Sequence, residues 1–252
     1  MAQMKTPGVY IIEKNAFPNS VVEVATAIPA FIGHTQFARD GNKDLTGIPF
    51  RISSMAEFHS FFGFAPTLRF GIRPEDSESE DTTNDINVLF PDGSCQLTLP
   101  KTFYALYYNM LLFYANGGGP CYIVSVGDYE HDFKSIDFTN ALLALKKEQE
   151  PTLVVVPEAV YMEEGDCYKV QTAALMHCGN DMKNRFAILD VFNGYKDENG
   201  AVIKSFRENI GSNFLAYCAS YYPWINTSIV TEKDITFYNI EKDSLEKLEE
   251  LS

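Results

Sequence analysis

The sequence predicts an α/β protein whose mixed, largely parallel sheet is flanked by helices and preceded by an extended N-terminal arm. Residues 152–157 (TLVVVP) are apolar without polar alternation, which is typical of a parallel strand that helices bury on both faces. From residue 121 onward, strand-like and helix-like segments alternate, and this order indicates β–α–β units. Residues 1–26 read as extended chain and are assigned to the arm.

The arm is predicted from two local signals. Thr6-Pro7-Gly8 disfavours a helix, and the β-branched and aromatic run Val9–Glu13 favours a strand. A strand at this position comes before any core has formed, so its unpaired edges need a partner. That partner can lie in the same molecule or in a neighbouring one, and the residues alone leave both possibilities open.

The composition bounds the class of protein. A chain of 252 residues that is 46% hydrophobic can form one large domain or two small ones with a substantial core. The net charge is −14, and no run of basic residues is present to neutralise phosphates. These two properties argue against nucleic acid as a partner.

Cysteine usage and hydropathy indicate where the protein resides. The five cysteines are scattered and form no C-x-x-C pair, which is typical of reduced thiols in the cytoplasm. They are Cys95, Cys121, Cys167, Cys178 and Cys218. The sequence has no charged-then-apolar leader and no apolar run of the roughly 18 residues that a membrane span needs. We therefore expect a protein that is cytoplasmic at assembly and makes no membrane contact of its own.

The first elements of the body are a strand and a short helix. Residues 30–34 predict a buried strand that ends at Gly33, and a polar, turn-rich segment follows it. Ser54 and Glu57 have the spacing of a capping box and open a predicted helix. That helix is expected to end at Gly63.

An acidic insertion is predicted at about residues 64–100. Its segment 74–85 holds six acidic residues and no basic one, so it favours a solvated loop. Residues 86–99 then predict a hairpin around Pro91-Asp92-Gly93.

Regular alternation of helices and strands follows the insertion. The predicted helices are 102–114, 137–147, 167–182 and 205–221, and the predicted strands are 121–126, 152–157 and 185–191. Asp137 is expected to cap the second of these helices, and Ser205 with Glu208 has the spacing of a capping box for the last. Residues 226–238 favour one or two further strands, and 241–252 a charged amphipathic helix or a tail.

Two carboxylates are the candidates for a catalytic site. Glu158 and Asp190 follow neighbouring parallel-type strands, and α/β enzymes place catalytic groups at such strand ends. Two carboxylates there can hold a metal or perform acid–base chemistry. Almost any α/β domain carries acidic residues at this edge as helix caps or loop residues, so a structural role is the favoured interpretation.

The remaining motifs also favour structure over chemistry. Asn116–Pro120 follows a helix and lacks the Lys-Ser/Thr of a phosphate loop, so it is interpreted as a helix C-terminus. His177 and Cys178 are adjacent on a predicted helix and point about 100° apart, so they form no dyad by themselves. For the aromatic cluster Tyr221–Trp224, packing or a subunit contact is favoured over a stacked ligand.

No catalytic residue, metal site or cofactor is expected. Three further histidines have no second metal ligand at a useful spacing; they are His34, His59 and His131. The motifs H-E-x-x-H and G-x-S-x-G do not occur in the sequence.

Five short pieces, in order along nearly the whole chain, carry a resemblance to a known family. They are TPGVY at 6–10 with AIPAFIG at 27–33, SMAEF at 54–58 with FG at 62–63, FYANGGG at 113–119 with CYIV at 121–124, RFAILD at 185–190, and YYPW at 221–224. The sequence thereby resembles the N-terminal part of contractile tail sheath proteins. These proteins occur in phage tails, R-type pyocins and extracellular contractile injection systems.

The resemblance implies a structural subunit and not an enzyme. Sheath subunits polymerise around an inner tube and, on triggering at the baseplate, contract to drive the tube through a target envelope. The implied partners are other sheath subunits in helical or stacked hexameric rings, the inner tube protein and the baseplate. The arm of each subunit is implied to join a sheet of its neighbours. The implied inter-subunit residues are Thr6, Pro7, Gly8, Val9, Tyr10, Ile11, Ile12 and Glu13.

The chain departs from the family pattern in two places. The acidic insertion at about 64–100 interrupts the sheath-type body, which is expected over residues 27–225. Family members also continue beyond Trp224 with a domain that accepts the neighbour's arm and touches the tube. Residues 226–252 are therefore expected to lead to a C-terminal sheath domain that is missing or absent.

Two alternative functions stay open. A baseplate or cap adaptor would use the same sheath-like fold without contracting, and it would be present in a few copies per particle. A small α/β enzyme would use Glu158 and Asp190, and it would hold both carboxylates in one deep cleft.

Overall fold

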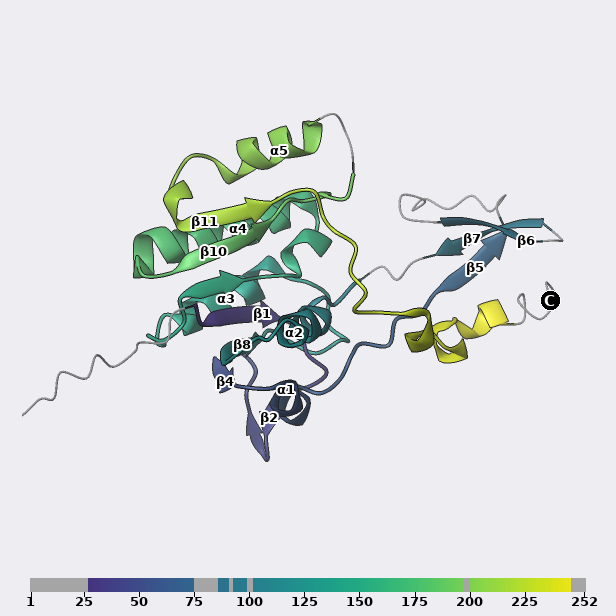
Figure 1. Ribbon diagram of the computed structural model, residues 1–252, viewed down its shortest axis with the longest axis horizontal. Helices are drawn as coiled ribbons and strands as arrows, with labels where there is room; N and C mark the ends of the chain where they lie inside the picture. Colours follow the sequence, from purple (N-terminus) through teal and green to yellow (C-terminus); the bar gives the residue numbers. More distant parts are fainter. Residues whose placement is uncertain (1–26, 75–85, 91–92, 99–101, 197–199, 246–252) are drawn as a thin grey trace, which may run out of the picture.

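The core of the protein is a mixed, largely parallel sheet with helices on both faces, as the sequence predicts (Figure 1). The computed structural model describes residues 27–74, 86–90, 93–98, 102–196 and 200–245. Within these residues the main sheet has six strands in the order β11-β10-β9-β1-β8-β4. The strands are β1 (Pro29–Gly33), β4 (Phe50–Ile52), β8 (Cys121–Ser125), β9 (Leu153–Val155), β10 (Phe186–Asp190) and β11 (Cys218–Tyr221).

The sheet is doubly wound. All neighbouring strands from β8 to β11 are parallel, and β4 pairs antiparallel with β8 at one edge. The first parallel strand, β1, lies between β8 and β9, and the later strands follow outward from β9. The strand order therefore reverses between β1 and β9, and in open α/β sheets the crevice at such a reversal is the usual ligand site.

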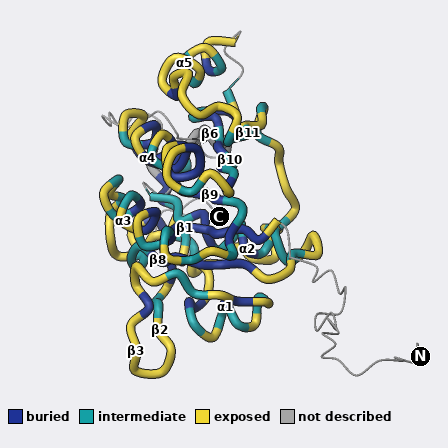
Figure 2. The backbone as a smooth tube through the Cα atoms, turned by 90° about the vertical axis from the view of Figure 1, so that its left-hand side faces the viewer, coloured by how far each residue is buried: buried dark blue, intermediate teal, exposed yellow. Residues whose placement is uncertain are grey.

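Two apolar clusters cover the two faces of the sheet. Helices α1 (Met55–Phe62) and α2 (Leu106–Ala115) pack on one face, and α3 (Ser135–Leu145) and α4 (Glu164–Met176) pack on the other (Figure 2). Alternate residues of each central strand belong to one cluster and then to the other. Because both faces of these strands are buried, the strands lack polar alternation. In β1, for example, Phe31 joins the cluster under α1 and α2, whereas its neighbours face α3 and α4.

The last helices extend this second face. α4 continues into the π-helix η2 (His177–Met182), which matches the helix predicted over 167–182. α5 (Ala201–Ile210) follows β10 and places Phe206 and Ile210 against the cluster under α4. A single-turn 3-10 helix, η1 (Ala159–Tyr161), leads from β9 toward α4.

The predicted hairpin in the acidic insertion is confirmed. β6 (Ile86–Phe90) and β7 (Gly93–Thr98) are antiparallel, and β5 (Gly71–Pro74) pairs with β7, so the three form a separate small sheet (Figure 1). A further two-stranded hairpin, β2 (Arg39–Asp40) with β3 (Lys43–Asp44), follows β1. The acidic segment 75–85 lies outside the described residues.

The observed starts of the helices differ in detail from the predicted ones. Ser54 caps α1 as expected and accepts the N–H of Glu57 at 3.2 Å, but the Glu57 carboxylate accepts the N–H of Ser53 and not that of Ser54. α2 begins at Leu106, four residues later than predicted. Asp137 lies inside the first turn of α3 and does not cap it.

The predicted helix over residues 205–221 is wrong. α5 spans Ala201–Ile210, so Ser205 and Glu208 are interior helix residues and not a capping box. The chain leaves the helix at Gly211, whose φ of 75° belongs to the left-handed region that glycine adopts without strain. Residues 218–221 then form β11, which pairs parallel with β10.

The C-terminal segment contains turns where strands were predicted. In residues 226–239 the described secondary structure consists of two 3-10 turns, η4 (Glu232–Asp234) and η5 (Phe237–Asn239). A threonine and the residue three positions later close each turn by side-chain hydrogen bonds, and these local bonds compete with strand pairing. Residues 242–245 are helical, in line with the predicted C-terminal helix.

The C-terminal segment is fastened to the start of the small sheet. Phe70 and Ile240 form a β-bridge, and the N–H of Ile72 donates to Ser244 Oγ at 2.9 Å.

Among the described residues, none of the helices is long and apolar enough to cross a membrane. The arm residues 6–13 lie outside the described part of the chain.

Candidate functional site

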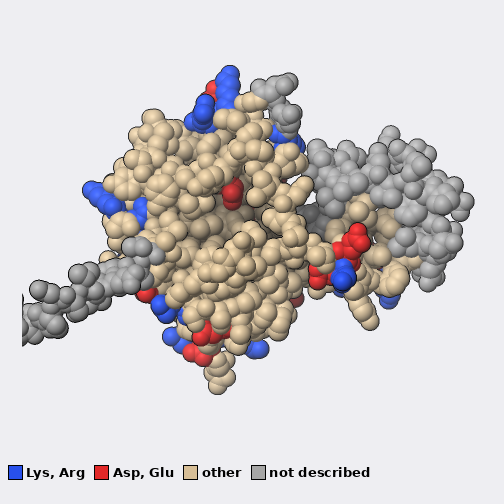
Figure 3. All heavy atoms as spheres, in the orientation of Figure 1, with Lys and Arg blue, Asp and Glu red and all other residues tan. Residues whose placement is uncertain are grey.

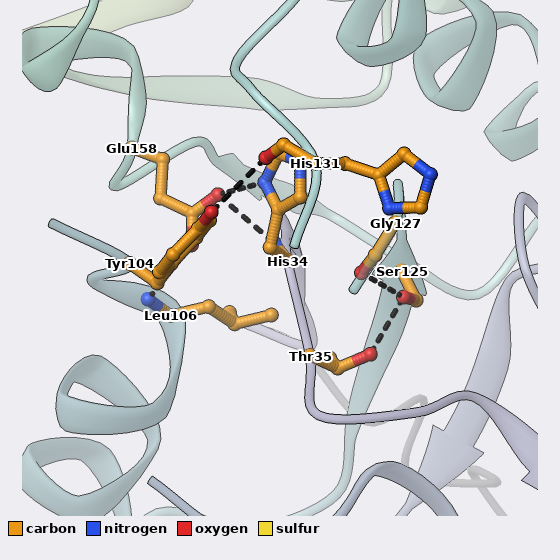
Figure 4. Close-up of polar contacts among 8 residues, drawn as sticks. All are labelled: His34, Thr35, Tyr104, Leu106, Ser125, Gly127, His131 and Glu158. Carbon is orange, nitrogen blue, oxygen red and sulfur yellow. Dashed lines mark hydrogen bonds and ion pairs between the residues drawn. The ribbon is translucent and has the colours of Figure 1, made fainter. Parts of the chain in front are cut away.

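The carboxyl ends of β1 and β9 meet at a buried pair, His34 and Glu158 (Figure 4). Glu158 Oε2 lies 2.8 Å from His34 Nδ1 and accepts the backbone N–H of His34 at 2.9 Å. Its other oxygen, Oε1, accepts the backbone N–H of Leu106 at 3.3 Å. The pair therefore occupies the point where the strand order reverses, and it joins two strands to the start of α2.

Glu158 provides the acceptor that α2 lacks at its own N-terminus. The cap position of α2 is Ala105, which has no side chain that can accept a hydrogen bond. The first N–H groups of a helix have no partner within the helix and carry partial positive charge. The carboxyl group of Glu158 is fully buried against them, and this burial raises its pKa, opposed by the hydrogen bonds from His34 and Leu106.

The surroundings of the pair are closely packed. The His34 ring lies among Tyr104, Phe133 and Phe138, with ring centroids 5.0 to 5.7 Å away. A Cβ atom on Gly33 would lie 2.9 Å from Leu106 Cβ and 3.0 Å from the Glu158 carboxyl carbon, so only glycine fits between strand and helix. The crevice at this position is thus filled by the protein's own side chains.

A second set of hydrogen bonds continues the network beside His34 (Figure 4). Thr35 Oγ1 lies 2.6 Å from Ser125 Oγ, and both the Thr35 N–H and the Ser125 hydroxyl donate to the carbonyl of Gly127. The Tyr104 hydroxyl donates to the carbonyl of His131. These bonds join the loops after β1 and β8, so the edge of the sheet is held by polar contacts within the chain.

Asp190, the second predicted carboxylate, lies at the same edge of the sheet but outside this network. It ends β10, one strand beyond β9, and burial raises its pKa. In the described part of the chain, no hydrogen bond or ion pair joins it to Glu158, whose partners are His34 and Leu106. The structure thus brings both acids to one edge without combining them in one site.

The contacts and burial of His177 and Cys178 indicate a structural role for both residues. Arg185 is buried, and its Nη1 donates to His177 Nε2 at 2.8 Å and to the carbonyl of Leu145 at 3.0 Å. Burial, and then the charge of Arg185, lower the pKa of His177 to about 4, so the ring is a neutral acceptor at pH 7. Burial raises the pKa of the Cys178 thiol to about 12, which disfavours the reactive thiolate.

The other cysteines and histidines whose side chains the structure describes form no metal cluster. Burial also raises the pKa of Cys121 to about 11 and that of Cys167 to about 12. His59 Nε2 lies 3.2 Å from the Tyr107 hydroxyl, and His131 Nδ1 contacts the carboxylate of Asp128. A search of the described residues finds no group of three or more His, Cys, Asp or Glu side chains that could hold a metal ion.

Asn116–Pro120 forms the end of α2, as predicted. Gly117 has a φ of 81°, and the N–H groups of residues 116–118 donate to carbonyls of the last turn. Those groups are therefore not free to bind phosphate. The segment lines an apolar groove of about 640 Å³ together with Phe31 and Leu112.

The aromatic cluster Tyr221–Trp224 combines packing and exposure. Trp224 Nε1 donates to the carbonyl of Val191 at 3.0 Å, and the Tyr222 hydroxyl donates to that of Lys196. Tyr221 is instead turned outward with 70% of its surface exposed. Sequence analysis did not identify His34 as the partner of Glu158. The sequence does show that His34 is a polar residue directly after a buried strand and Gly33, but this pattern does not reveal which residue it contacts.

No protein-family model matches this chain, and no curated protein is significantly similar to it.

Proposed function

We propose that this chain is a structural subunit of a contractile tail sheath, which polymerises around an inner tube and contracts to drive it through a target envelope. Its proposed partners are other sheath subunits, the tube protein and the baseplate, and its proposed arm residues are 6–13. The five pieces that resemble the family support the proposal. Those within the described residues map onto β1, α1, the end of α2 with β8, β10 and β11.

An exposed apolar stretch between Tyr221 and Tyr238 carries most of the support from the structure. It runs from the end of β11 to η5, and Ile225 is 82%, Phe237 79% and Tyr238 86% exposed. Several large apolar side chains exposed along one segment of a folded protein are typical of an interaction site. A subunit whose surface is covered by neighbours in a lattice would have this property.

The open edge of the sheet offers a second source of support. β11 pairs with β10 on one side and is the last strand of the main sheet in the described residues. Unpaired strand edges are the places at which a strand from another chain can add. The filled crevice at Glu158 is in keeping with a structural role, because that side chain is fully buried.

Electron microscopy of purified assemblies tests the proposal. The protein, together with any C-terminal sheath domain that continues it, would be co-expressed with its candidate tube protein and imaged in negative stain. Striated tubules with hundreds of copies per particle are expected. A variant with Ile225→Asp and Phe237→Asp should remain folded and lose the tubules, because charge would replace the exposed apolar contacts. Absence of tubules from the unchanged chain would contradict the sheath function, and a few copies per particle would indicate an adaptor.

A further inference from the structure

One face of the main sheet is only partly covered by helices. α2 lies over β1 and β8, whereas none of the helices that the structure describes lies over β10 on this side (Figures 1 and 2). Ala187 and Leu189 belong to the cluster on the opposite face, so the alternation of the strand turns Phe186, Ile188 and Asp190 toward the uncovered side. All three are partly accessible.

Asp190 brings an unpaired carboxylate to this side. Among the described residues, no side chain or N–H group makes a hydrogen bond or ion pair with its carboxyl oxygens. In the space-filling view, most charged side chains of this face lie toward its rim and few lie near its middle (Figure 3). A largely buried carboxylate without a partner is unfavourable, and a cation bound beside it would compensate it.

Aromatic rings lie beside the end of β10. Tyr161 has its ring centroid 6.2 Å from that of Trp224 and 4.9 Å from that of Phe103. Burial and then the negative charge of Asp190 raise the pKa of Tyr161. Tyr195 adds a fourth ring, 5.4 Å from Trp224.

Trp224 is held rigidly in this arrangement. Its indole N–H donates to the carbonyl of Val191, the residue after Asp190. Its ring also packs directly on Gly194, where an added Cβ would lie 2.5 Å from the indole. The indole ring is therefore fixed before any ligand arrives, and preorganisation of this kind lowers the entropic cost of binding.

We propose that the surface at Asp190, where β10 ends beside the ring of Trp224, binds an arginine side chain of a partner protein. A guanidinium group can pair with the carboxylate and stack on a neighbouring aromatic ring at the same time. Lysine offers a more strongly hydrated point charge and fits this combination less well. The inference rests on Asp190 and the rings around it and is independent of the sheath function.

The single tryptophan of the chain makes the proposal measurable. Because Trp224 is the only tryptophan, intrinsic tryptophan fluorescence reports on this position alone. Titration with Nα-acetyl-arginine amide should give a saturable change with a dissociation constant of about 10 mM or below. The neutral isostere Nα-acetyl-citrulline amide should bind at least fivefold more weakly, because it lacks the charge.

Two variants separate this site from general charge effects. Asp190→Asn should weaken binding of the arginine amide at least fivefold, whereas Glu208→Gln, a charge removal on the exposed surface of α5, should leave it unchanged. Thermal melts would verify that both variants are folded. A response without saturation, an equal response to the citrulline amide, or undiminished binding by folded Asp190→Asn would overturn the proposal. If Asp190→Asn fails to fold, the arginine–citrulline comparison on the unchanged chain decides.

Discussion

Glu158 satisfies three N–H groups on two other elements, so its loss would leave several buried donors without an acceptor. We expect Glu158→Ala to lower the free energy of unfolding by about 3 kcal/mol, because buried polar groups would lose their partner. Urea denaturation at pH 7 measures the change. Glu130→Ala, on an exposed loop, is the control and should stay within about 0.5 kcal/mol of the unchanged chain. Equal losses in both variants would contradict the assigned role.

His177 predicts a pH dependence of stability. Its pKa is lowered from 6.5 to about 4 in the folded protein, so the unfolded state binds a proton first as the pH falls. The contribution of this histidine is therefore present above about pH 6.5 and is lost progressively toward pH 4. Over that window the unchanged chain should lose about 2 kcal/mol more than His177→Gln, whose amide oxygen can still accept from Arg185.

The matched control for this prediction is an exposed histidine. His131→Gln removes an imidazole that is largely open to solvent, so its urea midpoints should fall with pH as those of the unchanged chain do. Parallel curves for the unchanged chain and His177→Gln would show that His177 is not the group responsible.

The position of Glu158 was predictable from sequence, but its partner was not. An acidic residue directly after a buried parallel strand is visible in the pattern, and so is the strand itself. Pairing with His34 spans 124 positions and depends on β1 lying beside β9. Local patterns contain no information on strand order. The sequence therefore suggested Asp190, which follows the next strand along the chain, as the residue that would share a site with Glu158.

At the scale of elements, the close packing of β1 against α2 requires a glycine, Gly33, at the contact. We expect Gly33→Ala to destabilise the fold by about 1–3 kcal/mol, because its Cβ would meet Leu106 and Glu158 at about 3 Å. Gly165→Ala is the matched control, since a Cβ in α4 meets nothing within 4 Å and should be neutral or stabilise the helix. Thermal unfolding of both variants measures the difference, and equal melting temperatures would contradict the close contact.

Buried elements were predicted well and surface elements poorly. β1, β8 and β10 are apolar and flanked by turn signals, so their positions follow from hydrophobicity alone. The segment 205–221 failed because a serine and a glutamate three residues apart also occur inside helices. Gly211 marked the true helix end, and the weakly patterned run 218–221 became a strand through its neighbour β10.

At the scale of the whole molecule, the body has a substantial core. Two apolar clusters drawn from residues between 28 and 210 pack on the two faces of the main sheet. Deletion of residues 1–20 should therefore leave circular dichroism and the melting temperature nearly unchanged, while the striated tubules of the unchanged chain are lost. Loss of folding would show that the arm belongs to the core, and normal tubules would show that assembly does not need it.

The position of β1 has a mechanical consequence. The described chain enters the sheet at this strand, which is bonded along both sides, to β8 and to β9. A tensile force applied at residue 27 along the strand would shear both ladders at once, so their hydrogen bonds would have to break together and not one by one. A strand at the rim of the sheet would peel away under a much smaller force. The topology thus anchors the N-terminal segment at the place where the sheet best resists being pulled apart.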